Sequence, residues 1–238
     1  MTALNQQTVL VTGAAQGLGR AIALYLAAQG ARLILMDRDA TALAQVSADC
    51  PDAVSVVVDL SDAGDTARAI AQTVTGPVHC LIHNAAILRV EPVDVVSLAT
   101  FQATLNVGIQ AAFQLTQAVW PGMKAAGGGT LVFVSSRSGI EGFVDETAYC
   151  AAKHALEGFS KCLAMEGAPH GIASYTITPG MLMQTPMSAT TYGPEQRAKW
   201  VNPSRLAPAF AMLASTRPMT LSGQRLDAWQ LSQQDQTA

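Results

Sequence analysis

Short apolar runs alternate along the chain with longer segments in which apolar residues recur every three or four positions. Such runs are typical of buried strands, and such segments are typical of helices packed on them. The alternation predicts one α/β domain over residues 1–238, a doubly wound and mostly parallel seven-stranded sheet with helices on both faces. The expected strands occupy residues 8–12, 32–36, 53–60, 79–83, 130–135, 172–178 and 223–229.

The first expected strand leads into a glycine-rich turn and then into a helix. Gly13, Gly17 and Gly19 have the spacing G-x-x-x-G-x-G, with Gln16 and Leu18 between them. Glycine lets the backbone turn tightly and approach a pyrophosphate, and the helix that follows offers free N–H groups at its positive end. This order predicts a dinucleotide site, and a purely structural turn is the alternative.

Acidic residues follow the second and third expected strands. Asp37 lies at a distance past the glycine turn that suits a carboxylate bound to ribose hydroxyls, and it would repel a 2′-phosphate. The adjacent Arg38 could instead bind that phosphate or lie against the adenine, and Asp37 could simply cap the next helix. Asp59, followed by Leu60, could accept a hydrogen bond from the adenine amine. We therefore expect NAD rather than NADP as the cofactor.

Small or polar residues occur at two further positions of interest. Asn84, Ala85 and Ala86 follow the fourth expected strand and suit either close approach of a cofactor or packing against the first strand. Asn106 lies within a long helix expected at residues 100–124, where a buried amide needs hydrogen-bond partners. Its spacing alone fits either a satisfied core residue or a residue that orders a water in a proton path.

Three side chains suited to proton transfer follow the fifth expected strand. Ser136 lies at the strand end, and Tyr149 and Lys153 are four residues apart on an expected helix, so they share one face. An ammonium beside a phenol favours the phenolate, which would let Tyr149 move a proton on and off an alcohol oxygen held by Ser136. Such a triplet also occurs by chance, so by itself it is weak.

Composition and charge narrow the class of protein. Half of the residues are apolar, the formal net charge is −3, and Lys and Arg form no basic run, which argues against nucleic-acid or anionic-membrane surfaces. No apolar run is long enough to span a bilayer and no signal region precedes the first strand, so we expect a cytoplasmic protein. The four cysteines lack metal-site spacing and are expected to be reduced and mostly buried, and the four histidines make no ligand pair.

Taken together, these motifs resemble those of the short-chain dehydrogenase/reductase family over nearly the whole chain. Residues 12–19 resemble its T-G-x-x-x-G-x-G turn. Residues 83–86 resemble its N-N-A-G segment, except that His83 stands in place of the first asparagine and Ala86 in place of the glycine. The resemblance implies a Rossmann fold and hydride transfer at a carbinol or carbonyl carbon. It also implies a catalytic tetrad of Asn106, Ser136, Tyr149 and Lys153.

Further expectations follow from this resemblance. Within the tetrad, Lys153 would bind the nicotinamide ribose and lower the tyrosine pKa, and Asn106 would hold a relay water. Pro179 and Gly180 resemble the P-G that borders the nicotinamide, and Thr185 stands one residue late for the threonine that touches the carboxamide. The family also implies a homotetramer or homodimer assembled through the two long helices.

The segment from residue 181 to residue 201 is rich in Met, Thr and Pro and is expected to form either a substrate lid or an ordinary surface connection. A polar, frayed tail is expected at residues 230–238. Arg137 could attract an acidic substrate or tie down its loop, and the structural role is the stronger expectation. The expected substrate walls are Ser138, Phe143, Val144, Met181, Met183 and Trp200.

The sequence thus predicts an oxidoreductase that transfers a hydride between NAD(H) and a secondary alcohol or ketone. An NADP(H)-dependent carbonyl reductase of the 3-oxoacyl type is one alternative. A non-catalytic NAD(P)-sensing protein on the same fold is another, and a methyltransferase with a similar glycine turn is disfavoured by the tetrad.

Overall fold

The computed structural model describes residues 4–191 and 193–234. Within these residues the strands form a seven-stranded sheet in the order β3-β2-β1-β4-β5-β6-β7, and every pair of neighbours is parallel. The expected doubly wound α/β sheet is therefore confirmed. The strands are β1 (Thr8–Thr12), β2 (Arg32–Asp37), β3 (Val54–Val57), β4 (Cys80–His83), β5 (Gly129–Val134), β6 (Ile172–Thr178) and β7 (Arg225–Asp227).

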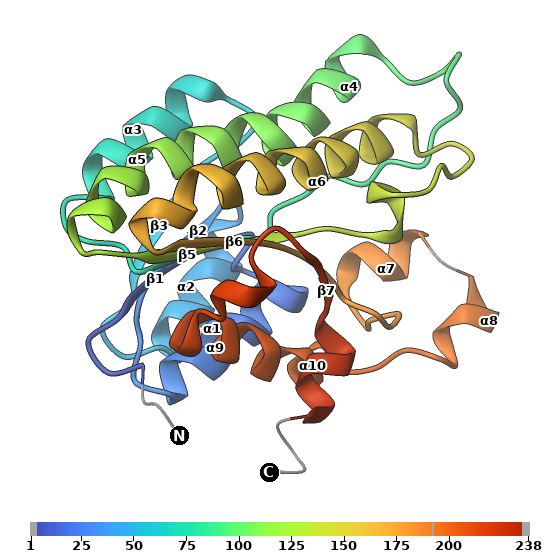
Figure 1. Cartoon of the computed structure of the whole chain (residues 1–238). Helices are drawn as coiled ribbons and strands as arrows, with labels where there is room; N and C mark the ends of the chain where they lie inside the picture. Colours follow the sequence, from blue (N-terminus) through green and yellow to red (C-terminus); the bar gives the residue numbers. More distant parts are fainter. Residues whose placement is uncertain (1–3, 192, 235–238) are drawn as a thin grey trace.

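Helices cover both faces of the sheet (Figure 1). Two apolar cores result, one under each helical layer, and parallel strands buried on both faces explain the near-continuous apolar runs of the sequence. One layer contains α1 (Gly17–Ala28), α2 (Ala40–Ala48) and α9 (Ala207–Thr216). The opposite layer contains α3 (Ala63–Thr73), α4 (Leu98–Leu105), α5 (Ala111–Ala125) and α6 (Thr147–Gly167).

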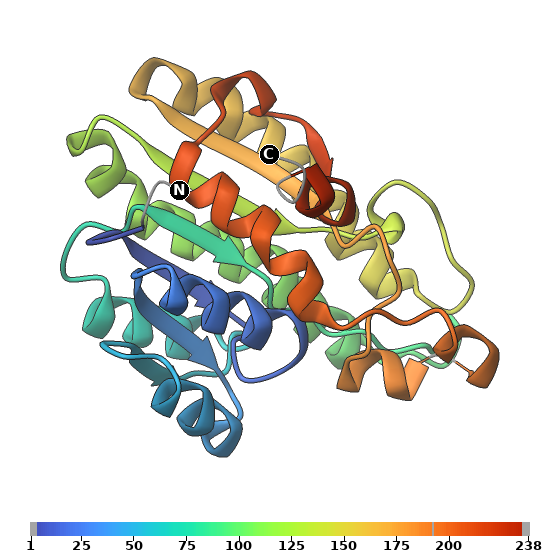
Figure 2. The ribbon, with the colours of Figure 1, turned by 90° about the horizontal axis from the view of Figure 1, so that it is seen from below.

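The order of the strands places a crevice at the carboxyl ends of β1 and β4. These two strands are neighbours, yet the chain winds outward from β1 to β3 before returning to β4, so connections leave in opposite directions. Ligands of open α/β sheets bind at such a reversal. Figure 2 shows α1, α2 and α9 in front of the strands, and the strands point towards α7 (Pro186–Thr191) and α8 (Pro194–Arg197).

The long helix expected at residues 100–124 is interrupted by a π-helical segment. The helix begins at Leu98, because the Ser97 hydroxyl accepts a hydrogen bond from the Thr100 N–H at 3.0 Å and caps it. The π segment Asn106–Gln110 joins α4 to α5. Such segments are short insertions in α-helices and are frequent at functional sites.

The C-terminal region differs from its expectation. The helix α10 (Ala228–Gln234) replaces the end of the last expected strand and the start of the expected frayed tail. The buried Ser232 hydroxyl donates to the Leu206 carbonyl at 3.1 Å and accepts from the Ala209 N–H, which ties α10 to the start of α9. The rest of the expected tail, residues 235–238, lies outside the described residues.

The cysteines are less buried than expected. Cys50 and Cys80 are buried, but Cys150 is half-buried and Cys162 is exposed on the outer face of α6. Among the described residues, no group of three or more His, Cys, Asp or Glu side chains is arranged to hold a metal ion. No helix in the described part of the chain combines the length and apolar character that crossing a membrane requires.

Candidate active site

A cavity of about 790 Å³ lies at the carboxyl ends of the strands. Most of the residues singled out in the sequence line it, although they come from loops far apart in the chain. Gly19, His83, Asn106, Val144 and Trp200 do not line it. Those that do are Gly13, Gln16, Gly17, Leu18, Asp37, Arg38, Asp59, Leu60, Asn84, Ala85, Ala86, Ser136, Arg137, Ser138, Phe143, Tyr149, Lys153, Pro179, Gly180, Met181, Met183 and Thr185.

The glycine turn forms a cradle that side chains would fill. Gly13 has a φ of +64°, and a Cβ there would lie 2.9 Å from the Ala85 Cα. Gly19 has a packing role, because a Cβ on it would collide with the Gly13 carbonyl. No side chain caps the N-terminus of α1, so its N–H groups and the positive end of the helix dipole face the cradle. These features fit the pyrophosphate of a dinucleotide.

Asp37 closes the opposite side of the glycine turn. One oxygen of its carboxylate accepts a hydrogen bond from the Ala15 N–H at 2.9 Å, and the other accepts from the Asp39 N–H at 3.0 Å. The alternative that Asp37 caps the following helix is wrong, because Asp39 caps α2 by accepting from the Ala42 N–H. Arg38 is exposed and lines the cavity beside Asp37.

Asp59 carries a carboxylate whose pKa is lowered. The main causes are hydrogen bonds from the Ser61 backbone N–H at 2.9 Å and from the Ser61 hydroxyl at 2.7 Å, with a smaller contribution from the charge of Arg38. Its second oxygen accepts no hydrogen bond among the described residues. Asp59 can therefore still accept one from a ligand.

His83 replaces an asparagine of the family pattern and is buried rather than part of the cavity wall. Its Nε2 lies 3.0 Å from the Val107 carbonyl oxygen and 3.1 Å from that of Gly108, and its Nδ1 lies 3.1 Å from the Thr12 hydroxyl. Because carbonyls only accept, Nε2 carries the proton and Nδ1 accepts from Thr12. Burial, and secondarily the Lys153 charge, lowers the pKa of His83 to about 4.

The Thr12 hydroxyl connects this histidine to the cavity. It accepts hydrogen bonds from the backbone N–H groups of Asn84 and Ala85, each at 3.1 Å. The Asn84 amide donates to the carbonyls of Thr12 and Gly13 at 3.2 and 3.1 Å. The loop after β4 is thereby held against the glycine turn.

Ser136, Tyr149 and Lys153 converge on the cavity from the end of β5 and from α6. Lys153 is 2% exposed, and its Nζ donates to the Val134 carbonyl at 2.6 Å and lies 5.4 Å from the centre of the Tyr149 ring. Burial lowers the pKa of Lys153 to about 8, although the Glu157 carboxylate opposes this shift. The amine therefore lies beside the aromatic ring, as the helical spacing predicts.

Asn106 is the one residue of the expected tetrad that does not line the cavity. Its amide nitrogen donates to the Ser61 carbonyl at 2.8 Å, and its amide oxygen accepts from the Gln102 side chain at 2.8 Å. The side chain ties the start of the π segment to the loop after β3. A relay water held by Asn106 stays a prediction.

The expected substrate walls are partly wrong. Val144 is 87% exposed and does not line the cavity, and Trp200 follows α8 in the segment 181–201, where the Arg197 guanidinium lies over its ring. A bridge between Met183 and Val201 joins the two ends of this segment. Thr185 accepts from the Ser188 N–H at the start of α7, and it lies against Gly17.

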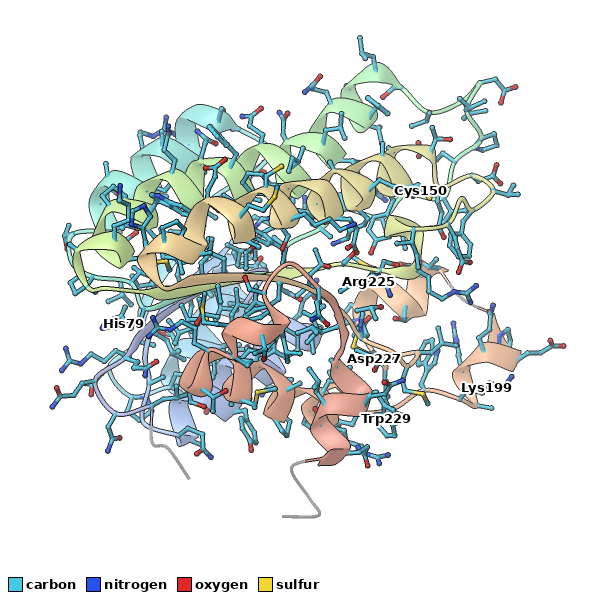
Figure 3. All side chains as sticks on the ribbon, viewed as in Figure 1. His79, Cys150, Lys199, Arg225, Asp227 and Trp229 are labelled. Carbon is cyan, nitrogen blue, oxygen red and sulfur yellow. The ribbon has the colours of Figure 1, made fainter. Side chains whose placement is uncertain are left out.

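A buried network that the sequence reading missed fixes the Ser136 loop. Arg225 donates to the Ser136 carbonyl at 3.0 Å and to the Glu157 carboxylate at 3.2 Å. The hydroxyls of Ser135 and Thr176 also donate to Glu157. Figure 3 shows Arg225 and Asp227 at β7, on the side of the sheet end that faces residues 181–201, and both line the cavity.

Arg137 lines the cavity, but its guanidinium binds partners within its own loop. Its guanidinium pairs with Glu141 at 2.7 Å and lies over the Phe143 ring at 5.5 Å. These contacts support the expected structural role. Glu146, by contrast, lines the cavity, and the sequence reading did not single it out. The sequence spacing could have identified Glu146, because it lies three residues before Tyr149 and residues at this spacing share one helical face.

The fold and this cavity define an α/β nucleotide-binding protein, and comparisons identify its family. The family model for short chain dehydrogenases matches residues 7–196. The L-xylulose reductase of Bos taurus is 35% identical over 197 residues, which cover 82% of this chain and 80% of that protein. The chain belongs to the short-chain dehydrogenase family.

Solved structures agree with this assignment. One from Beutenbergia cavernae, with bound NADP at low occupancy, has a TM-score of 0.87 and 29% identity, and covers 96% of this chain and 98% of its own. A 3-ketoacyl-(acyl-carrier-protein) reductase from Brucella melitensis, complexed with NADH, has a TM-score of 0.86 and 26% identity. It covers 94% of this chain and 97% of its own.

Proposed function

We propose that this protein is an NAD(H)-dependent oxidoreductase that interconverts a secondary alcohol and a ketone. The observation that carries the proposal is the convergence of Ser136, Tyr149 and Lys153 in the cavity that the glycine turn also lines. Membership of the short-chain dehydrogenase family supports the same reaction class. The bound nicotinamide would supply or accept the hydride.

The proposed roles of the three residues follow from their positions. Tyr149 transfers the proton to and from the substrate oxygen, and Ser136 holds that oxygen by a hydrogen bond. Lys153, whose ammonium lies beside the Tyr149 ring, favours the phenolate and binds the nicotinamide ribose. Its burial keeps competing water away from the ammonium.

The proposed cofactor contacts lie at the other end of the cavity. Gly13, Gln16, Gly17 and Leu18 hold the pyrophosphate at the N-terminus of α1. Asp37 accepts from the adenosine ribose and disfavours a 2′-phosphate, which supports NAD. The remaining proposed contacts are Arg38, Asp59, Leu60, Asn84, Ala85, Ala86, Pro179, Gly180 and Thr185.

A second candidate is an NADP(H)-dependent reductase of the 3-oxoacyl type. Arg38 lines the cavity next to Asp37, where a guanidinium could bind a 2′-phosphate. Met181, Met183 and Met187 also line it and could contact an acyl chain. Comparing NAD with NADP in one assay separates the two candidates.

The test of the proposed function is the Tyr149→Phe variant. Because the variant keeps the ring and loses only the hydroxyl, turnover is expected to fall by about a hundredfold or more, with unchanged cofactor affinity. NADH absorbance with a panel of secondary alcohols and ketones measures turnover, and wild type is expected to prefer NAD over NADP. Tyr25→Phe on α1, outside the cavity, is the matched control. Undiminished turnover of Tyr149→Phe would reject the proposal.

A further inference from the structure

Glu146 is the acidic side chain nearest to the proposed reacting groups along α6. It lies at the N-cap of α6, three residues before Tyr149, and lines the cavity. The Ser138 hydroxyl donates to its carboxylate at 2.9 Å, and the Ser138 hydroxyl in turn lies 3.3 Å from the Ser136 hydroxyl. The carboxylate is thus connected through one serine to the hydroxyl that is proposed to hold the reacting oxygen.

No cation pairs with Glu146 within residues 4–191 and 193–234. The nearest arginine along its loop, Arg137, is paired with Glu141. A carboxylate only accepts hydrogen bonds and has about four acceptor sites, of which Ser138 occupies one. Glu146 therefore presents open acceptor sites to whatever enters the cavity beside Ser136.

The chemistry of this position selects among substrates. An acyl chain over Glu146 would remove water from the carboxylate without supplying a donor, which is costly. A carboxylate substrate would meet a like charge. An ammonium substrate would meet the Lys153 ammonium, which lines the same cavity. A neutral ligand with hydroxyl groups next to its carbonyl avoids all three penalties.

We infer that Glu146 and Ser138 bind substrate hydroxyl groups adjacent to the reacting carbon, so that the enzyme acts on polyhydroxy ketones and the matching polyols. The inference rests on the proposed function, which supplies the position of the reacting oxygen at Ser136 and Tyr149. It goes beyond that function by naming the substrate class and two residues that select it. An acyl-type substrate is disfavoured by the same contact.

The kinetic test compares two ketones with one carbon skeleton. Erythrulose carries hydroxyls on the carbons beside its carbonyl, and 2-butanone carries none. Wild type is expected to prefer erythrulose in kcat/KM, and Glu146→Gln is expected to reduce that preference by about ten- to a hundredfold, the worth of a hydrogen bond to a charged group. Glu166→Gln, which removes an exposed carboxylate on the same helix, is the matched control and should keep the preference.

A binding test keeps the inference separate from the proposed reaction. Quenching of NADH fluorescence measures how erythritol or 2-butanol binds to the enzyme–NADH complex, where no hydride transfer can follow. Tighter binding of erythritol in wild type, lost in Glu146→Gln, supports the inference even if neither ketone is turned over. Equal binding of the two alcohols, or a preference that survives Glu146→Gln, overturns it. Absence of turnover by itself contradicts only the proposed function.

Discussion

His83 couples three parts of the molecule through one neutral ring. It receives a hydrogen bond from Thr12 at the end of β1 and donates to carbonyls of the π segment. A protonated ring could not accept from Thr12, and its charge would be buried near Lys153. The contacts that hold the end of β1 and the π segment together therefore require the uncharged form of His83.

This neutrality predicts acid-sensitive stability. An unfolded histidine titrates near pH 6.5, whereas the pKa of His83 is about 4, so between these values the unfolded chain binds more protons and stability falls as pH falls. At pH 5 the contribution of His83 is reduced by about 2 kcal/mol relative to pH 8. Urea unfolding of wild type and His83→Asn at pH 8 and pH 5 measures it.

The His83→Asn variant should lose less free energy of unfolding between pH 8 and pH 5 than wild type. His154→Asn, at an exposed position on α6, is the control for replacing a histidine by asparagine. Equal pH dependence in wild type and His83→Asn would show that the ring is not held neutral.

At the scale of single residues, motifs with fixed spacing could be predicted from the sequence, whereas the directions of side chains in loops could not. Tyr149 and Lys153 share a helical face because their spacing requires it. Val144 was predicted to lie in the substrate wall with Phe143, but the Phe143 ring lies beneath the Arg137 guanidinium and Val144 is 87% exposed. Loop direction depends on long-range packing, which local sequence does not encode.

At the scale of elements, the short strand β7 links several parts of the cavity wall. Arg225 begins the strand and binds both the Ser136 carbonyl and Glu157 on α6. The Arg225 side chain therefore joins β7, the loop that contains Ser136, and α6, which carries Tyr149 and Lys153. The Glu157 side chain is only 9% exposed, so its carboxylate depends on these partners.

We expect Arg225→Ala to lower the free energy of unfolding by about 3 kcal/mol, because it leaves a buried carboxylate without its cation. Turnover should fall as well, since the Ser136 turn loses a hydrogen bond. The double variant Arg225→Met/Glu157→Gln removes both charges and should recover part of the stability but not of the turnover. Urea unfolding and steady-state kinetics distinguish these results. Unchanged stability and turnover of Arg225→Ala would contradict the role given to the Arg225 contacts with Ser136 and Glu157.

The strands and long helices were predictable because their patterns extend over many residues. The third strand ends at Val57 rather than at residue 60, because the Asp59 carboxylate turns the chain through Ser61. Three features were not predictable: the six-residue α7, the π segment and the conversion of the tail into α10. The helix α7 is too short to show helical periodicity in the sequence. The helix α10 depends on a hydrogen bond between Ser232 and the start of α9.

At the scale of the whole molecule, apolar side chains are exposed on the outer helical layer. Phe113 on α5 is 51% exposed, and Met165 on α6 is 71% exposed. Exposed apolar side chains on neighbouring helices favour association. These are the two long helices through which the family resemblance implies a homodimer or homotetramer.

Light scattering on the purified protein is therefore expected to give the mass of two or four chains at micromolar concentration. Phe113→Asp should shift the mass towards one chain, because it places a charge within the proposed contact. Val93→Asp, at an exposed apolar position before α4, serves as a control for added charge. A wild-type mass of one chain would contradict the association.

The position of Arg225 late in the chain has a consequence for biosynthesis. The glycine turn follows β1 and Asp37 ends β2, and these two strands leave the ribosome first. Arg225, which binds the Ser136 carbonyl, belongs to β7, the last strand to be synthesised. The nucleotide end of the cleft can therefore take shape during translation. The end that contains Ser136 matures only after the final strand has docked.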